Sequence, residues 1–303
     1  MRDNLRRSRA IRRSLTQCYP GEPTGNVARH LNTLAALISG IVASKRTQLP
    51  KVASTVPEGT KPESRVKRCA RWMRNNLVTE AGYVLPYAEV LRAHRALPTL
   101  VLVIDGSVVG RGGVALMMPV VSTGRALPVA WLVRQGKQGH FPASLPIALV
   151  EHVPELIPEG VPVVLLGDGE CDGTNLQETI ADAGWSSVCR TGRTRTATWQ
   201  DEPFRLDTIG TCIKPGTLVA LSDVHFTADA YGPMMRLCCW ATGDKAPLYL
   251  VTNLTSAEEA CRLYAQRFRI APFFSDQKSR GFPLPKSHFS APERLTRLLM
   301  AAC

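Results

Sequence analysis

Two short apolar runs, each followed by an acidic residue, constrain the fold of this chain more than any other feature. Thr99–Ile104 is followed at once by Asp105, and Val161–Leu166 is followed by Gly167 and Asp168. Continuous β-branched runs of this length are typical of strands buried on both faces of a sheet. Because the ends of such strands line the ligand crevice of an α/β sheet, we expect Asp105 and Asp168 to lie side by side.

The neighbouring segments predict an α/β fold with a mixed sheet. Gly113–Val121 and Ala126–Val133 have strand character, and Ser122–Arg125 between them has the composition of a hairpin turn. Helices are expected over residues 143–156 and 175–183, with a further strand over 186–190. Residues 191–250 interrupt this alternation with short Thr- and Val-rich runs. They predict an inserted, mostly β module.

Positive charge is concentrated in the first quarter of the chain. Residues 1–75 hold 16 Lys and Arg against four Asp and Glu, whereas the remainder holds 21 of each, so the whole net charge of +12 lies in that quarter. A localised basic block is typical of a polyanion partner, most often nucleic acid, although a solubilising segment would have the same composition.

Helical periodicity runs through the same quarter. Thr24–Ser44 repeats apolar residues at helical spacing, and Leu49–Lys61 has the composition of a proline-bearing linker. Ser64–Leu77 carries an apolar stripe and a cationic one, which consists of Lys67, Arg68, Arg71 and Arg74. We therefore expect a helical, basic DNA-binding domain over residues 1–95 and a catalytic domain over 96–303.

The site chemistry expected from the two aspartates is divalent metal binding. Carboxylate oxygens are hard ligands that suit Mg²⁺ or Mn²⁺. The nine cysteines form no Cys-x-x-Cys pair, which fits reduced thiols in a cytoplasm rather than a zinc site or a disulfide framework. No run approaches the roughly 20 apolar residues of a membrane span, so no membrane partner is expected.

A third element completes the pattern near the C-terminus. Thr255 and Ser256 followed by Glu258 and Glu259 predict the start of a helix with a capping box, and Pro272 is expected to bend or end that helix. Within it, Tyr264, Arg267 and Lys278 have the spacing of a known signature. The segment resembles the Tyr-x2-Arg-x3-Glu-x6-Lys motif of DDE transposases from bacterial insertion sequences, in the insertion-sequence-four group.

That resemblance covers nearly the whole chain and implies a fold and a site. The family has an RNase H-like fold and uses two divalent metal ions to cut the ends of an insertion sequence and join them to target DNA. By resemblance, Asp105 and Asp168 would ligate Mg²⁺ or Mn²⁺. Tyr264, Arg267 and Lys278 would hold DNA phosphates near the cut. Trp240, in the insertion, would stack on an extruded base.

One position departs from the family pattern. Ala271 stands where the motif has its glutamate, the third catalytic acid. Neither neighbouring acid is a good substitute: Asp276 lies about 140° round an ideal helix, and Glu259 lies roughly 18 Å away along its axis. The chain also ends within an apolar helical pattern, where relatives usually continue. We therefore expect a decayed, truncated copy or a deliberately inactivated one.

Three functions remain open at this stage. The first is a transposase whose catalysis is impaired. It would act on double-stranded DNA, at the terminal inverted repeats and at a target, with a homodimer as the expected assembly. The second is a non-catalytic regulator that binds element ends, and the third is a metal-dependent nuclease of the same fold. Each would act in the bacterial cytoplasm, in association with the nucleoid.

Overall fold

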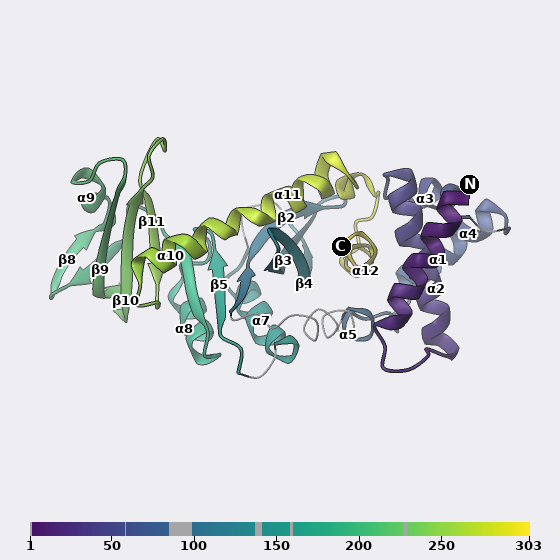
Figure 1. The fold of residues 1–303 in the computed structure, drawn as a ribbon, viewed down its shortest axis with the longest axis horizontal. Helices are drawn as coiled ribbons and strands as arrows, with labels where there is room; N and C mark the ends of the chain where they lie inside the picture. The colour runs from purple at the N-terminus through teal and green to yellow at the C-terminus, as the bar shows by residue number, and fades with distance from the viewer. Residues whose placement is uncertain (1, 58, 85–98, 137–140, 158–159, 227–229) are drawn as a thin grey trace.

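The computed structural model describes residues 2–57, 59–84, 99–136, 141–157, 160–226 and 230–303. Helices of the N-terminal region form one end of an elongated molecule, a mixed sheet lies in the middle, and the sheet continues to the opposite end (Figure 1). The predicted α/β class with a helical N-terminal region is thereby confirmed. The domain boundary expected between residues 95 and 96 falls outside the described residues.

Five helices make up the N-terminal region as described: α1 (Arg2–Gln17), α2 (Gly25–Ser44), α3 (Leu49–Thr55), α4 (Pro62–Arg74) and α5 (Glu80–Tyr83). The length and apolar composition of α2 would suffice for a membrane span, yet half of that stretch is buried within the protein, against α1, α3 and α4. The linker expected at Leu49–Lys61 is wrong for its first half. Pro50 lies in the first turn of α3, where a missing N–H costs nothing, and Val52 packs into the core.

The central sheet has the strand order of an RNase H-like fold. Its strands run β4 (Arg125–Gln135), β3 (Gly113–Ser122), β1 (Leu100–Val103), β5 (Val163–Gly167) and β6 (Ser186–Arg190). β1, β5 and β6 are mutually parallel, whereas β3 is antiparallel to β1 and β4. β2 (Asp105–Val109) continues the line of β1 along β3. The predicted hairpin turn at Ser122–Arg125 is confirmed by the register of these two residues.

Helices cover both faces of this sheet because its central strands are apolar on both. On one face, Leu102 and Leu165 pack with Leu149 of α7 (Ser144–His152) and Ile180 of α8 (Thr174–Asp182), and a 3-10 turn (Val153–Leu156) follows α7. Val103 and Leu166 point to the opposite face, which packs against the C-terminal helices.

The insertion extends the same sheet beyond β6. Its elements are β7 (Thr196–Trp199), β8 (Glu202–Arg205), α9 (Leu206–Thr211), β9 (Thr217–Phe226), β10 (Tyr231–Trp240) and β11 (Leu248–Thr252). β11 pairs with β6, and the order continues through β10, β9 and β7 to β8 at the edge. Arg236 of β10 is fully buried, and its guanidinium lies 3.6 Å from the centre of the Phe226 ring.

A long helical run then crosses back over the sheet (Figure 1). It comprises α10 (Ala257–Tyr264), a 3-10 segment (Ala265–Arg269), α11 (Ile270–Ser275) and a π-helical segment (Asp276–Arg280). The capping prediction is confirmed, because the Ser256 hydroxyl accepts the N–H of Glu259 at 3.2 Å. Of the two outcomes expected at Pro272, a bend or an end, the end does not occur. Pro272 is the third residue of α11, in the first turn, where a main-chain N–H has no partner within the helix to lose.

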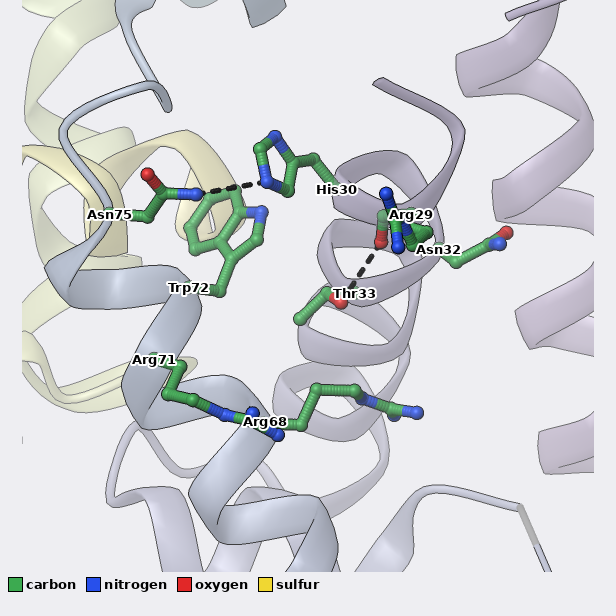
Figure 2. Close-up of a pocket in the computed structure, with 8 residues that line it drawn as sticks. All are labelled: Arg29, His30, Asn32, Thr33, Arg68, Arg71, Trp72 and Asn75. Atoms are coloured by element: carbon green, nitrogen blue, oxygen red, sulfur yellow. Dashed lines mark hydrogen bonds between the residues drawn. The ribbon is translucent and has the colours of Figure 1, made fainter. Parts of the chain in front are cut away.

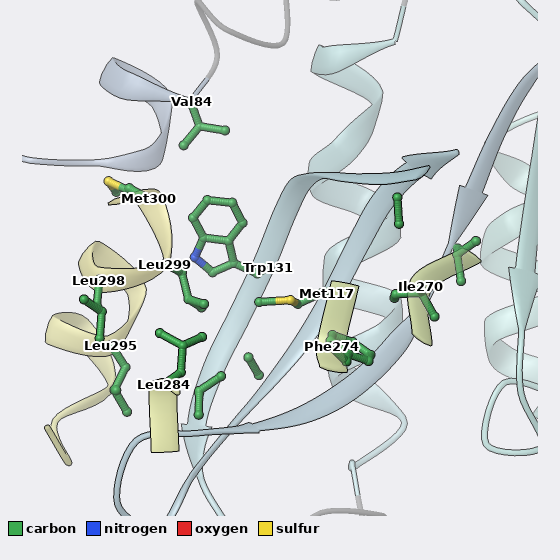
Figure 3. Close-up of a cluster of buried hydrophobic side chains, with 14 of the residues drawn as sticks. Val84, Met117, Trp131, Ile270, Phe274, Leu284, Leu295, Leu298, Leu299 and Met300 are labelled. Carbon is green, nitrogen blue, oxygen red and sulfur yellow. The ribbon is translucent and has the colours of Figure 1, made fainter. Parts of the chain in front are cut away.

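The last helix, α12 (Pro292–Ala302), follows a short 3-10 turn (Leu284–Lys286) and joins the sheet to the N-terminal helices. Its apolar side chains pack on Trp131 of β4 and Met117 of β3 (Figure 3), while α2, α4 and α5 contact its other side. The buried Arg297 donates to the carbonyls of Met73 and Val78, each at 3.1 Å, and to Oδ1 of Asn76 at 3.2 Å. The C-terminal helix thus completes the core of the N-terminal region.

Candidate active site

The candidate active site lies where the parallel strands β1, β5 and β6 end. β1 and β5 pair Val103 with Leu166, and β5 and β6 pair Gly167 with Cys189. Continuing both registers sets Asp105, Asp168 and Arg190 in one row across the sheet. The chain therefore places two acids and one cation at a single edge of the sheet, as the carboxyl ends of parallel strands require.

Main-chain N–H groups fix the orientation of both carboxylates. The N–H of Gly106 donates to Oδ1 of Asp105 at 2.7 Å, and the N–H of Glu170 donates to Oδ1 of Asp168 at 3.0 Å. The loop that follows Asp168 is itself anchored by the buried Asp172. Its carboxylate accepts the Thr191 hydroxyl at 2.7 Å and the Arg195 guanidinium at 3.0 and 3.2 Å. Each acid thus keeps its Oδ2 for another partner.

Two glycines beside these acids allow close packing that a larger residue would prevent. A Cβ on Gly106 would lie 2.2 Å from the ring of Phe141, and one on Gly167 would lie 2.4 Å from Cβ of Cys171. Both separations are far below ordinary van der Waals contact. A side chain at Gly106 or Gly167 would therefore force Phe141 or Cys171, respectively, to shift.

Arg267 brings the two carboxylates together. Its Nη2 lies 3.1 Å from Oδ2 of Asp105 and 3.4 Å from Oδ2 of Asp168, so both acids face one nitrogen atom. The side chains are only partly accessible, at 16% for Arg267, 21% for Asp105 and 34% for Asp168. The two predicted metal-binding acids therefore do share one cation, and that cation is the guanidinium.

The electrostatics of the site follow from this burial. Burial raises the pKa of Asp105 above its ordinary value, and the charge of Asp168 adds to the rise, while Arg267, the Gly106 N–H and Lys278 oppose it. Burial also raises the pKa of Tyr264 to about 12, against the opposing charges of Arg267 and Arg190. Arg267 and Lys278 act on Asp105, and Asp168 acts on Tyr264, so these three residues lie near the acid pair. Their binding of DNA phosphates stays a prediction.

Ala271 offers no ligand at this site. It is exposed on α11, one turn beyond Arg267. Asp276 is exposed and lines a separate cavity with Arg125 and Arg269. Glu259 forms an ion pair with Arg262 at 3.4 Å. Within the described ranges, no group of three or more His, Cys, Asp or Glu side chains could hold a metal ion.

The remaining residues expected from the sequence lie away from the acid pair. Trp240 ends β10, and its indole N–H donates to the carbonyl of Asp244 at 3.0 Å, within the turn of the insertion. Lys67 and Arg74 are exposed on α4, whereas Arg68 and Arg71 line a cavity between α4 and α2.

Sequence reasoning did not identify Arg190 or the α2 side of that cavity. Arg190 had a usable signal, because it follows a third buried strand just as the acids follow the first two. Arg29 and His30 had none, because their importance depends on which helix packs beside α2.

Comparison with known proteins identifies the fold. No family model and no curated protein matches this sequence. The piggyBac transposase in its synaptic complex with hairpin DNA superposes on 99% of this chain and 70% of its own, with a TM-score of 0.51 and 11% identity. Two crystal structures of human endonuclease V, one of them of its catalytic domain, align over 67% and 72% of this chain and 82% and 92% of theirs, each with a TM-score of 0.32 and 15% identity. This chain has the fold of the piggyBac transposase.

Proposed function

We propose that this chain is a DNA transposase of the insertion-sequence-four type whose catalytic capacity is impaired. The observation that carries the proposal is the meeting of Asp105 and Asp168 at one cation, at the ends of adjacent parallel strands, in a fold shared with a transposase. Its partners would be element ends with terminal inverted repeats and target DNA, bound by a homodimer, in the nucleoid of a bacterial cytoplasm.

The donor set fits one divalent cation. Asp105 and Asp168 already direct both Oδ2 atoms at a single positive group, and carboxylate oxygens are the ligands that Mg²⁺ and Mn²⁺ prefer. When bound there, the cation would stabilise charge on a phosphate and activate the attacking oxygen. The family's second cation does not fit as well, because Ala271 contributes no oxygen to complete its coordination.

The chain's own residues would serve mainly to position DNA. Arg267 presents a planar, multi-donor head suited to a phosphate, and Lys278 adds a second charge near Asp105. In the structure, however, Arg267 is paired with both acids. A phosphate that engaged Arg267 would therefore also release the carboxylates to bind the metal ion.

The test is a nicking assay on DNA that carries the element's ends, in Mg²⁺ or Mn²⁺. We expect little cleavage by the chain as it is and a gain of roughly 100-fold or more with Ala271→Glu, since ligand positioning supplies much of the rate in phosphoryl transfer. Adding Asp168→Asn to that variant should abolish the gain.

Two outcomes of this assay would contradict the proposal. Robust cleavage by the unmodified chain would refute the impairment. Equal cleavage of DNA without inverted repeats would instead indicate a metal-dependent nuclease.

A second candidate is a DNA-binding regulator without catalysis. It is favoured by Ala271, which supplies no third acid, and by Arg267, which already occupies the two carboxylates. Such a regulator would bind element ends equally well with and without Mg²⁺. Ala271→Glu would also leave it inactive in the nicking assay.

A further inference from the structure

A cationic cavity lies between α2 and α4, remote in sequence from the acid pair. Its volume is about 540 Å³. It is lined from α2 by Arg29, His30, Asn32 and Thr33, and from α4 and the residue after it by Arg68, Arg71, Trp72 and Asn75. Figure 2 shows Arg68 and Arg71 leaving α4 on the side that faces α2. The cavity therefore gathers arginines from two helices.

Arg29 and Arg71 bring positive charge to the cavity from two helices, and the described residues that line it include no Asp or Glu. Arg29 bonds to the neutral Oδ1 of Asn26 at 2.6 Å. Guanidinium groups bring many donors in a fixed plane and match the geometry of carboxylate or phosphate oxygens. A ligand of this cavity would have to be anionic and rich in acceptors.

Trp72 supplies a second, independent sign of a missing acceptor. The residue is 3% exposed, and its Nε1 has no hydrogen-bond partner. Figure 2 shows the indole nitrogen directed towards α2, on the side of Arg29 and Thr33. A buried donor without an acceptor is costly, by about 1–3 kcal/mol, so buried indole N–H groups usually find partners. An oxygen of a bound ligand would satisfy it.

The wall of the cavity is fixed before any ligand binds. The Nδ1 atom of His30, on α2, lies 2.6 Å from the hydroxyl of Tyr83. Its Nε2 atom lies 2.9 Å from the Nδ2 atom of Asn75. This chain of contacts ties α2 to the ends of α4 and α5. Thr33 is held by its bond to the carbonyl of Arg29 at 3.1 Å. Little ordering would therefore be needed on binding.

We propose that this cavity is a binding site for a phosphate group, and that the group belongs to the DNA backbone. Arg29 and Arg71 hold the phosphate from opposite helices, and the Trp72 N–H donates to one of its oxygens. The choice of DNA as the source rests on the proposed function, whereas the phosphate chemistry rests on the cavity alone. Lys67 and Arg74 lie outside the cavity and do not contact this phosphate.

The main test is a double-mutant cycle on DNA binding by the full chain, measured by fluorescence anisotropy over a range of salt. The full chain is needed because deleting residues 1–75 would also uncover α12. Arg29→Ala and Arg71→Ala should each weaken binding about tenfold and reduce the salt slope by about 0.9, the contribution of one neutralised phosphate. The double variant should lose little more than either single one, because both arginines hold the same phosphate.

Two matched variants sharpen the cycle. Arg74→Ala, on the same helix but outside the cavity, should combine additively with Arg71→Ala. Trp72→Phe keeps the ring's packing and removes only the N–H, so it should weaken binding a few-fold with an unchanged salt slope. Additive effects of Arg29→Ala and Arg71→Ala would overturn the proposal, because the two arginines would then contact separate phosphates.

A second measurement separates the two possible sources of phosphate. Inorganic phosphate should raise the melting temperature above that in chloride of equal ionic strength, and Arg71→Ala should remove this difference. If phosphate stabilises the chain through Arg71 while neither Arg29→Ala nor Arg71→Ala affects DNA binding, the cavity binds a free phosphate compound and the DNA assignment is wrong. If phosphate gives no stabilisation and the cycle shows no coupling, the site itself is refuted. None of these results depends on DNA cleavage, so they are distinguishable from failure of the transposase proposal.

Discussion

Arginine is placed in two contrasting surroundings in this molecule. At the strand ends, Arg267 is matched by two carboxylates and fills the space between them. In the cavity between α2 and α4, Arg29 and Arg71 meet no acidic residue among the described side chains of the lining. The first setting attracts cations once its own is displaced, and the second attracts anions. The same side chain therefore indicates opposite ligands, and only the neighbouring residues reveal which.

The largest effect is expected from removing the two acids at the strand ends. Asp105→Asn combined with Asp168→Asn should weaken Mn²⁺ binding by about 100-fold or more, because even residues that merely support metal ligands contribute 10–100-fold. Isothermal titration with Mn²⁺ measures this directly. Asp207→Asn, in an exposed pair with Arg205, is the control and should leave the affinity unchanged. Equal Mn²⁺ affinity in the double variant would place the metal elsewhere.

The next effect removes the cation and leaves the acids. Arg267→Ala should lower the free energy of unfolding by about 2–3 kcal/mol near neutral pH, since two partly buried carboxylates would then face one another uncompensated. Urea denaturation would measure the loss, and millimolar Mg²⁺ should restore much of it. Arg262→Ala breaks the exposed pair with Glu259 and should cost well under 1 kcal/mol. A variant that Mg²⁺ does not rescue would argue against a shared cation site.

A smaller effect is expected from adding an acid to the cavity between α2 and α4, as at the strand ends. Asn32→Asp places a carboxylate of nearly the same shape on the exposed rim beside the arginines. We expect DNA affinity to fall about tenfold, while unfolding stability changes by no more than about 0.5 kcal/mol, as for other surface ion pairs. Anisotropy and thermal melts on the same preparation would compare the two. Unchanged DNA affinity would show that the cavity's charge does not contribute to binding.

The smallest effect concerns pH and Asp105. Because burial raises the pKa of this carboxyl in the folded state, the folded chain binds the proton more tightly than the unfolded chain. That contribution to stability is present at low pH and is lost as pH rises through the folded-state pKa. Asp105→Asn removes it, so the variant should gain stability relative to the parent as pH rises from about 4 to 7. Denaturation midpoints that differ by a constant amount across this range would contradict the raised pKa.

The acid pair could be predicted because its signal is local. Asp105 and Asp168 each follow a buried strand, and parallel pairing then fixes their row without further information. Ser256 and Glu259 likewise define a helix start within four residues. The α/β class followed from the same local runs.

The cavity could not be predicted because no local signal defines it. The cationic stripe on α4 was visible, but nothing in the sequence said that Arg68 and Arg71 would face α2 while Lys67 and Arg74 would not. The helix at Leu49–Thr55 was missed because it is short and its buried apolar residues, Leu49, Val52 and Ala53, stabilise it only by packing on α2 and α4. In both cases the deciding information lies in another helix.

The position of α12 has a consequence for synthesis of the protein. Its Arg297 joins residues more than 200 positions earlier, at Met73 and Val78, and its apolar face fills the core beside α2 and α4. On a ribosome, the N-terminal helices therefore emerge long before the segment that completes them. The N-terminal helices can therefore complete their packing only after residues 292–302 have left the exit tunnel.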